Sequence, residues 1–419
     1  MEFINLNEKE YRKFYNSYED ASFMQSIELG NLKKEYGNVV HLVGIKENKK
    51  IVGATLLLET KTILNKSIFY APRGLMVDYH NKERLKFFTE ELKKYIKKHN
   101  GFVLTIDPSI IYRERSSNGE ILGDGDDETI NNLKELGYKH YGFNIYLDSK
   151  QARWCYRMKL DEDYEVKKSK FSKSTRKNIE STYKKGLQVR KGTIEDLDVM
   201  TEIFDITAKR KDFFSRSLDY YKKMYKNMSD LMTIYIAYLN PDVYLEHTES
   251  LLETEKKKNK ELEEKMKNEM TGNKLKNQKE TSDKLVEKYE KELEKAKEFK
   301  KENPNGKDIG CLLSIKSGRE YLTLSSGVLQ DYKSFTPKYQ MYEKHIEDAY
   351  KNDFKYCNFY GITGDFNPEN KYYGIYEFKK GFSGNVIEYV GEFELEVTKF
   401  NKIYKALRKI KTILRRYTP

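Results

Sequence analysis

Residues 309–327 read IGCLLSIKSGREYLTLSSG, two apolar runs separated by a turn at Ser317-Gly318. Apolar runs on both sides of a serine–glycine turn predict two adjacent strands. The run LMTIYIAYL at residues 231–239 predicts a third strand upstream of this pair. A helix over 336–351 and a strand over 355–362 follow, so the order of elements indicates an α/β or α+β layer.

The first half of the chain shows the same order of elements as this later half. In both halves a pair of helices precedes three strands, a further helix and a fourth strand. The first half has helices over 8–18 and 27–36, strands over 39–46, 51–59 and 67–74, a helix over 82–99 and a strand over 102–108; the later half has leading helices over 195–210 and 217–228. A helix near 126–136 and a strand pair around 138–148 complete the first half. The match lies in element order rather than residue identity, and it predicts two similar domains that arose by duplication.

A long charged segment, residues 246–302, separates two strands of the second copy. It contains no proline, one glycine and a charge at more than half of its positions. Apolar residues recur at helical spacing on both sides of Thr271-Gly272-Asn273, and Pro241 and Pro304 bracket the segment. The pattern predicts two helices folded back on each other as an antiparallel coiled-coil arm, which reaches roughly 40 Å at ~1.5 Å per residue. Two uses stay open: contact with a large partner such as a nucleic acid, or a spacer or dimer contact.

The composition limits the class of protein. The length of 419 residues suggests two or three domains, and the net charge of +12 suggests an anionic partner such as tRNA, a membrane surface or a diphosphate. Cys155, Cys311 and Cys357 lack the spacing of a disulfide framework or a zinc site. The N-terminus lacks the pattern of a secretory signal, and no stretch is long and apolar enough to span a membrane. We therefore expect a soluble cytoplasmic protein.

Two basic segments have two interpretations each. Residues 166–177 are rich in lysine and hydroxyl groups and open a helix, which is either a solvated face or a phosphate contact. In the tail, residues 402–416, Leu407, Ile410 and Leu414 share one helical face among lysines and arginines. That helix either rests on anionic lipid headgroups or docks on the first domain.

Several short motifs, in order along nearly the whole chain, resemble those of one family. They are Phe23-Met24-Gln25-Ser26 with Gly30 and Lys33, Tyr70-Ala71-Pro72-Arg73-Gly74, Ile106-Asp107-Pro108, Lys173-Ser174-Thr175-Arg176-Lys177-Asn178-Ile179, Ala208-Lys209-Arg210 with Arg216 and Tyr220, and Glu377-Phe378-Lys379-Lys380-Gly381-Phe382. By their order and spacing the chain resembles the FemABX peptidoglycan aminoacyltransferases, which build the interpeptide bridge of bacterial cell walls.

The resemblance implies an α/β (α+β) fold of two tandem GNAT (acyl-CoA N-acyltransferase)-like domains with one active site between them. We expect the first domain over residues 1–157, with the segment 390–419 packing back on it, and the second over 158–390, with the arm at 243–304. The implied reaction moves glycine, serine or alanine from aminoacyl-tRNA to the stem-peptide amine of lipid II or UDP-MurNAc-pentapeptide. The resemblance implies no cofactor and no metal. Contact with lipid II would bring the protein to the inner face of the cytoplasmic membrane.

The implied reaction needs few special residues, because an aminoacyl ester is already activated and aminolysis depends mainly on position and charge. A proton must leave the amine, and the tetrahedral oxyanion needs a hydrogen-bond donor. By the resemblance, Lys33 and Arg216 contact the diphosphate of the precursor and Tyr220 lines its site. On residue type alone, the two cations would be ordinary surface residues, and Tyr220 would fill the core as readily as contact a ligand.

Three further residues complete the candidate site. Phe378 and Lys379 match a family position near the acceptor end of the tRNA. Lys379 would steady terminal phosphates or the developing oxyanion, and Phe378 would either stack on a base or fill the core. Asp107 follows a predicted strand, so it either orients or deprotonates the attacking amine or caps the strand end.

Two other functions stay open. An N-acetyltransferase would bind acetyl-CoA, but neither half carries the R/Q-x-x-G-x-G/A loop that holds the pyrophosphate between a strand and a helix. A non-catalytic scaffold would use the coiled-coil arm alone. The sequence also leaves open which amino acid moves, which bridge position it fills, whether the acceptor is lysine or diaminopimelate, and the oligomeric state.

Overall fold

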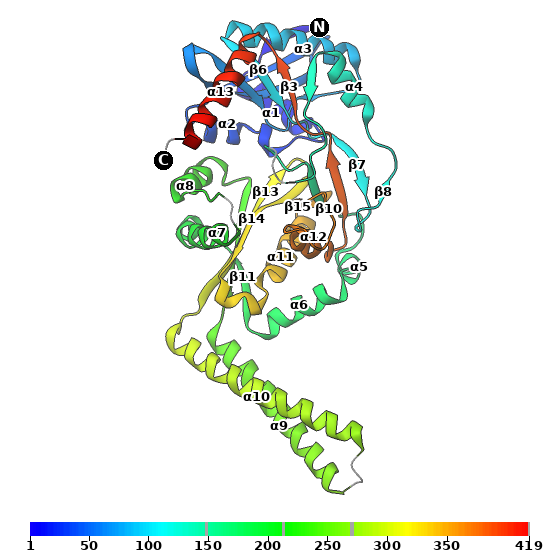
Figure 1. Ribbon diagram of the computed structural model, residues 1–419, viewed down its shortest axis with the longest axis vertical. Helices are drawn as coiled ribbons and strands as arrows, with labels where there is room; N and C mark the ends of the chain where they lie inside the picture. The colour runs from blue at the N-terminus through cyan, green and yellow to red at the C-terminus, as the bar shows by residue number, and fades with distance from the viewer. Residues whose placement is uncertain (147–149, 212–213, 269–271, 418–419) are drawn as a thin grey trace.

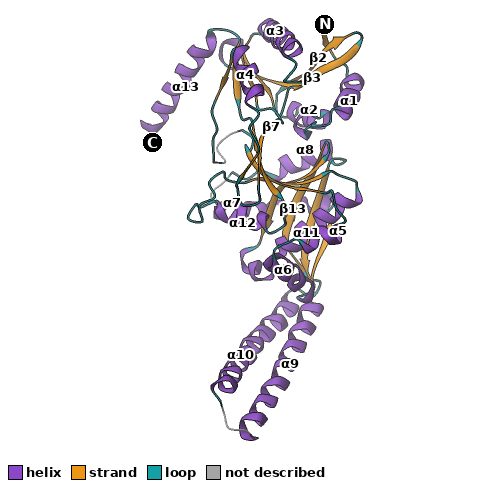
Figure 2. Cartoon of the chain, turned by 90° about the vertical axis from the view of Figure 1, so that its right-hand side faces the viewer, coloured by secondary structure: helices purple, strands orange, loops and turns teal. Residues whose placement is uncertain are grey.

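The computed structural model describes residues 1–146, 150–211, 214–268 and 272–417. Two β-sheets with helices around them form two stacked units, and a pair of long helices projects from the second unit (Figure 1). The view from the side shows α2 of the first unit close to α8 of the second (Figure 2). The predicted α/β class, with two tandem units and an insertion in the second, is confirmed.

The first unit is built on a mixed sheet with strand order β1-β2-β3-β4-β6-β17-β9, and β5 pairs with β3 at its side. Its strands are β1 (Glu2–Asn5), β2 (Val39–Glu47), β3 (Lys50–Lys61), β4 (Ser67–Ala71), β5 (Met76–Val77), β6 (Gly101–Ile106), β9 (Tyr138–His140) and β17 (Phe393–Glu396). Its helices are α1 (Glu8–Ser17), α2 (Ile27–Lys34), α3 (Lys82–Lys98), α4 (Asp127–Glu135) and the C-terminal α13 (Phe400–Tyr417). The apolar face of α3, with Leu85, Phe88 and Leu92, is fully buried in the core of this unit.

The second unit is built on a sheet with strand order β11-β12-β13-β14-β15-β10-β16-β7-β8. Its strands are β7 (Ile111–Arg115), β8 (Ile121–Leu122), β10 (Trp154–Lys159), β11 (Leu187–Lys191), β12 (Met232–Leu239), β13 (Lys307–Ser317), β14 (Glu320–Val328), β15 (Tyr356–Gly361) and β16 (Asn385–Tyr389). Its helices are α5 (Tyr164–Ser169), α6 (Lys173–Lys184), α7 (Leu197–Lys211), α8 (Leu218–Met228), α11 (Pro337–Lys351) and α12 (Tyr373–Lys380), besides the two of the arm.

The two units repeat one pairing pattern. β2 is antiparallel to β3, β3 is antiparallel to β4, and β4 is parallel to β6. In the second unit β12, β13, β14 and β15 pair in the same antiparallel, antiparallel and parallel order. A helix connects the strands of each parallel pair, α3 in the first unit and α11 in the second, as parallel strands require. The topology therefore agrees with the duplication that the order of elements predicts.

The two sheets exchange strands where the units meet. β7 and β8 lie in the second sheet although α4 and β9 of the first unit follow them, and β17 returns to the first sheet. The strand pair expected around 138–148 is wrong, because β9 ends at His140 and its partner in the sheet is β17 rather than the next segment. Residues 147 and 148 lie outside the described residues. The domain limits at residues 157 and 390 stay a prediction.

The charged segment forms two helices, α9 (Pro241–Asn268) and α10 (Asn273–Glu302), which pack against each other. α9 follows β12 almost directly, because Pro241 suits the first helical position and the Asn240 side chain accepts two main-chain N–H groups of the first turn. Among the apolar residues that recur at helical spacing in this segment, Leu262, Ala296 and Phe299 are buried. Met270 and Thr271 lie outside the described residues.

The base of the arm belongs to the core of the second unit. Tyr244 on α9 packs against Phe299 and Phe335, with ring centroids 6.0 and 5.0 Å apart. Further along the arm, the fully buried Ser282 donates a hydrogen bond to Glu255 over 2.7 Å between the two helices. The arm is therefore fixed to the body by apolar contacts and carries a buried polar contact along its length.

The two units meet through α2 and α8. Leu29 and Leu32 on α2 are buried in the same cluster as Tyr221 and Met224 on α8. At the edge of this interface Arg319 forms ion pairs with Glu19 and Asp20 over 2.5 and 2.7 Å. This contact sets the distance between the side chains that the two helices present to the cleft.

Candidate active site between the two units

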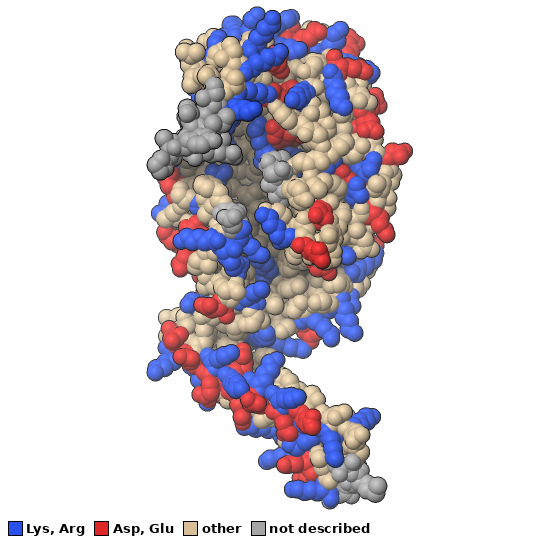
Figure 3. All heavy atoms as spheres, in the orientation of Figure 1, with Lys and Arg blue, Asp and Glu red and all other residues tan. Residues whose placement is uncertain are grey.

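A cleft with a cavity of about 670 Å³ lies between the units. Figure 3 shows this hollow on the face drawn in Figure 1, with lysine and arginine side chains on its borders. Its walls come from η1 (Phe23–Gln25), α2, β3 and β4 of the first unit and from α7, α8, β13 and β14 of the second. The cavity therefore joins side chains that are far apart in the sequence.

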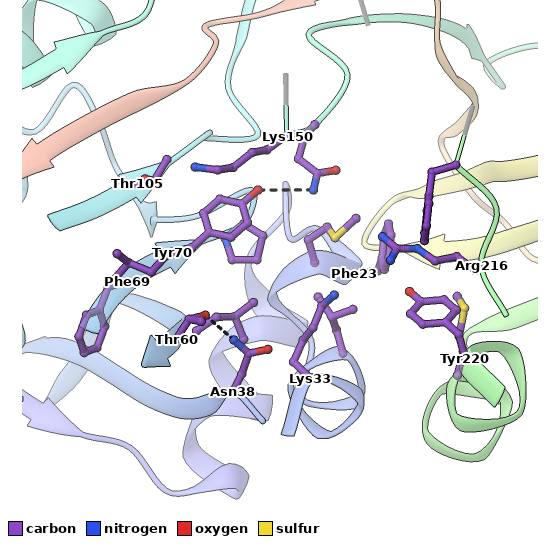
Figure 4. A pocket seen from close by; sticks show the side chains of 18 of the residues that line it. Phe23, Lys33, Asn38, Thr60, Phe69, Tyr70, Thr105, Lys150, Arg216 and Tyr220 are labelled. Carbon is purple, nitrogen blue, oxygen red and sulfur yellow. Dashed lines mark hydrogen bonds between the residues drawn. The ribbon is translucent and has the colours of Figure 1, made fainter. Parts of the chain in front are cut away.

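Lys33, Arg216 and Tyr220, the three residues predicted for the precursor site, all line this cavity (Figure 4). Lys33 lies on α2, whereas Arg216 precedes α8 and Tyr220 lies in its first turn. The Arg216 guanidinium lies over the Tyr220 ring, 5.0 Å from its centroid, which holds the cation by a cation–π contact. The structure thus brings the three residues together from both sides of the interface between the units.

The surroundings of Lys33 and Arg216 favour the binding of an anion between them. Burial lowers the pKa of Lys33, and the charge of Arg216 lowers it further. Within the described residues, neither cation forms an ion pair with a carboxylate. Two cations that repel each other without a counter-charge are stabilised when an anion binds between them.

The cleft also contains cations that the sequence analysis does not predict for this site. Lys150 reaches it from the connection after β9, and Lys405 and Arg408 reach it from α13. Lys405 is already engaged, because it pairs with Glu394 and lies 3.2 Å from the Tyr141 hydroxyl. The basic tail predicted from the sequence therefore contributes side chains to the cleft.

A second group of cations lies where β14 and β15 stop pairing. The two strands are hydrogen-bonded only from Glu320 to Leu322. The cavity reaches Leu324 and Ser325, in the portion of β14 beyond this pairing. The opening in the sheet is therefore in contact with the cleft.

Lys379 on α12 is buried beside this opening, and its ammonium donates to the main-chain oxygens of Tyr360 and Gly361 over 3.3 and 2.7 Å. Burial lowers the pKa of Lys379 to about 7, and the charge of Lys338 contributes. Burial, with the charges of Arg210 and Lys211, lowers the pKa of Lys338 to about 8. Among the described residues, neither lysine is paired with a carboxylate, so this opening also favours an anion.

Phe378 lies in an aromatic cluster of the second unit. Its ring meets those of Tyr339, Tyr342 and Phe382 at centroid distances of 5.1, 4.9 and 5.4 Å. The side chain is partly exposed rather than buried. This position agrees with core packing, and it leaves part of the ring exposed for stacking with a nucleotide base.

Asp107 follows β6 and is almost fully buried, and burial raises the pKa of its carboxyl to about 6. Its Oδ1 accepts the main-chain N–H of Arg73 over 2.6 Å, and its Oδ2 accepts the Tyr70 hydroxyl over 2.7 Å. Tyr70 lines the cavity, but Asp107 stands behind it. The aspartate therefore reaches the cleft through Tyr70.

The basic segment before α6 is largely engaged within the protein. Lys167 pairs with Asp161 over 3.1 Å, and Lys168 pairs with the fully buried Glu343 over 2.7 Å. Arg176 donates to the main-chain oxygen of Phe171. These contacts engage three of its cations within the protein, and the choice between a solvated face and a phosphate contact stays a prediction.

Comparison with known proteins adds to this geometry. The model of the FemAB family matches residues 6–411. Aminoacyltransferase FemA of Staphylococcus epidermidis is 32% identical over 420 residues, which cover 98% of this chain and 100% of that protein. Aminoacyltransferase FemA of Staphylococcus aureus (strain N315) is 30% identical, over 98% of this chain and 99% of that protein.

One solved structure shows the same fold. The crystal structure of FemX superimposes with a TM-score of 0.75 at 22% identity, over 94% of this chain and 97% of that chain. The likeness to FemX concerns the fold alone, whereas the family match spans nearly the whole sequence. The protein described here therefore belongs to the FemAB family of aminoacyltransferases.

Proposed function

We propose that the protein transfers an aminoacyl group from aminoacyl-tRNA to the stem-peptide amine of a peptidoglycan precursor, either lipid II or UDP-MurNAc-pentapeptide. The observation that carries the proposal is the pair of unneutralised cations, Lys33 and Arg216, that the interface between the units brings into one cleft. Both precursors carry a diphosphate, and a planar guanidinium with an ammonium beside it suits that group. Tyr220, stacked against Arg216, would line the same site.

The donor would enter from the opening between β14 and β15. Lys338 and Lys379 are cations without carboxylate partners in the described structure, so phosphates or an ester oxygen would relieve their repulsion. Phe378, on the same helix as Lys379, would offer the exposed edge of its ring to a terminal base. In this arrangement the acceptor amine and the aminoacyl ester meet between the two groups of cations.

The chemistry requires positioning more than a nucleophilic side chain. The acceptor nitrogen attacks the ester carbonyl carbon, and an oxyanion forms at the carbonyl oxygen. The bond to the ribose oxygen then breaks, and the proton lost by the amine passes to that oxygen. The positive charge of Lys379 would stabilise the oxyanion or the departing ribose oxygen.

We assign Asp107 to the support of the site rather than to direct proton transfer. Both of its oxygens already accept hydrogen bonds, from the Arg73 main chain and the Tyr70 hydroxyl. The carboxylate thereby orients Tyr70, which faces the cleft (Figure 4). The substrate's own groups would then move the amine proton.

Two surfaces would bind the larger portions of the substrates. The arm projects from the unit that holds Lys379, and we propose that it contacts the tRNA (Figure 1). The start of α13 packs on the first unit, where the rings of Phe400 and Tyr404 lie 5.1 and 4.9 Å from that of Phe102. Ile403 and Leu407 remain 55% and 43% exposed among basic residues, which would place α13 at the inner face of the membrane that holds lipid II. Among the described residues, no helix has the length and apolar character to cross a membrane.

The test is direct. The purified protein is mixed with lipid II, or in a parallel reaction with UDP-MurNAc-pentapeptide, and with each of a set of charged tRNAs. We expect the mass of one precursor to rise by one aminoacyl residue, and the tRNA that supports this identifies the amino acid. Transfer from acetyl-CoA instead would support an N-acetyltransferase, and no transfer with any donor would support a scaffold.

A further inference from the structure

A chain of partly buried hydrogen bonds connects the wall of the cleft with Lys379. Tyr70, whose hydroxyl donates to Asp107, lies 3.4 Å from the amide nitrogen of Gln151 (dashed line at Tyr70 in Figure 4). The amide oxygen of Gln151 accepts the hydroxyl of Tyr360 over 2.8 Å. The main-chain oxygen of Tyr360 in turn accepts the ammonium of Lys379. The chain runs from β4 of the first unit to α12 of the second.

The backbone is held in an uncommon conformation at two positions, at Tyr360 within this chain and at Arg73 beside Asp107. Tyr360 has φ 61° and Arg73 has φ 53°, in the left-handed region that residues other than glycine rarely adopt. Each is fixed by its neighbours: the Tyr360 N–H donates to Asn358 over 2.8 Å, and the Arg73 N–H donates to Asp107. Conformations of this kind persist where surrounding contacts enforce them, and they often serve a site. At Tyr360 the conformation accompanies a carbonyl that faces Lys379.

Gln151 is the residue that joins the two units in this chain. It lies between β9 and β10, in the connection that leads from the first unit into the second sheet. Its side chain lines the cleft, and its amide contacts one tyrosine from each unit. An amide can serve both partners, since it offers a donor and an acceptor at one position.

We propose that Gln151 and Tyr360 are positioning residues, which set the place of the Lys379 ammonium from the wall of the precursor cleft. This inference rests on the proposed function of Lys379. It assigns neither residue a contact with the reacting atoms. We call the hydrogen-bonded chain of Asp107, Tyr70, Gln151, Tyr360 and Lys379 the relay. The relay would align the donor side of the site with the acceptor side.

The experiment is a double-mutant cycle with Gln151→Leu, Tyr360→Phe and both together. Each single variant should lower kcat roughly 5- to 30-fold, as expected for the loss of a partly buried hydrogen bond that positions a charged group. The KM for the precursor should change less than twofold, because Lys33 and Arg216 are untouched. The double variant should be no slower than the slower single variant, since both substitutions remove the same bond.

The matched control is Tyr235→Phe, which removes a hydroxyl that donates to Asp348 over 2.7 Å outside the relay. It should leave kcat within twofold of wild type. Multiplying effects in the double variant, a rise in KM at unchanged kcat, or an equal loss in the control would overturn the relay. Wild-type enzyme in the same assay separates the two claims: absent wild-type transfer counts against the proposed function, and normal wild-type transfer with unchanged variants counts against the relay.

Discussion

In the first unit the parallel strands β4 and β6 are paired from Ser67 to Ala71, along the whole of β4. In the second unit the corresponding strands, β14 and β15, are paired only from Glu320 to Leu322, although β14 continues to Val328. The same topology thus yields a closed sheet in one unit and an open sheet in the other. The opening is where the cavity contacts β14 and where the second unit places Lys338 and the buried Lys379.

The helices that follow these strands differ in the same way. α4, which comes after β6, buries Ile130 and Leu133 in the apolar core of the first unit. α12, which comes after β15, buries Lys379 against main-chain oxygens. The hairpins differ too, because β2 and β3 are joined by a tight turn whereas the arm joins β12 and β13. The two units therefore share one topology, and the second differs from the first in its buried lysine and its projecting helices.

The sharpest test of this difference replaces Lys379 by methionine, of similar size and without charge. We expect kcat to fall about 10²- to 10³-fold, the usual loss on removing a donor from an oxyanion site. Lys380→Met, on the same helix, is the control and should keep nearly full activity. Steady-state kinetics with lipid II and charged tRNA measures both, and equal activity of wild type and Lys379→Met would remove this lysine from the mechanism.

The same substitution should leave the thermal midpoint unchanged or raise it, because an unpaired buried charge costs stability. The pKa of Lys379 is about 7 in the folded protein and near 10.4 in the unfolded chain. Between these values the unfolded chain binds more protons, so wild-type stability gains about 1.4 kcal/mol per pH unit from this residue as pH rises. Lys379→Met should lack that gain, which unfolding in urea between pH 7 and pH 10 would show. Parallel pH profiles of the two proteins would contradict the burial of this charge.

Both units should contribute to binding of the precursor, because each presents one cation to the cleft. Lys33→Ala in the first unit and Arg216→Ala in the second should each raise the KM for the precursor about 10- to 100-fold, with a smaller change in kcat. Arg216→Lys should fall between these variants and wild type, because it keeps the charge but loses the planar fork. Lys34→Ala, beside Lys33 but half-exposed, is the control. An effect on kcat alone would place the two cations elsewhere in the reaction.

Much of this architecture could be predicted because it depends on local patterns. The repeated order of helices and strands reflects apolar periodicity, and the arm reflects a long helical pattern without proline. The strands at the junction depend on distant partners instead. β7 is held in the second sheet by pairing with β16, where Arg115 contacts Glu388. No local sequence pattern near Arg115 indicates a partner so far along the chain.

The candidate site was only partly predictable, for the same reason. The resemblance to the family identifies Lys33, Arg216 and Lys379, because it carries information about the fold that residue type does not. Lys338 and Gln151 are not predicted, because neither a lysine among 78 basic residues nor a glutamine outside the family motifs carries a local sign of its contacts. The weak signal for Gln151 was its place between the two repeats, in the segment that has to connect them.

A further prediction concerns the arm, which the first unit lacks. Replacing residues 255–286 by a short glycine-rich turn keeps the packed base around Tyr244 and Phe299 and removes ten lysines and seven acidic residues. We expect the KM for tRNA to rise about tenfold, with a weaker dependence on salt, because fewer phosphate contacts remain. The KM for the precursor should not change. Unchanged tRNA kinetics would make the arm a spacer, and an equal effect on both substrates would point to a change in the body.

The smallest expected effect lies within the arm. Ser282 is fully buried between α9 and α10, where it donates to Glu255 and lies 3.2 Å from the Asn259 amide. Ser282→Ala should cost about 1 kcal/mol of local stability, which hydrogen exchange of the arm amides would register as about fivefold faster opening. Transfer should stay within twofold of wild type, because the arm keeps its length and surface charge. A larger loss of transfer would mean that the rigidity of the arm, and not only its charge, distinguishes the second unit from the first.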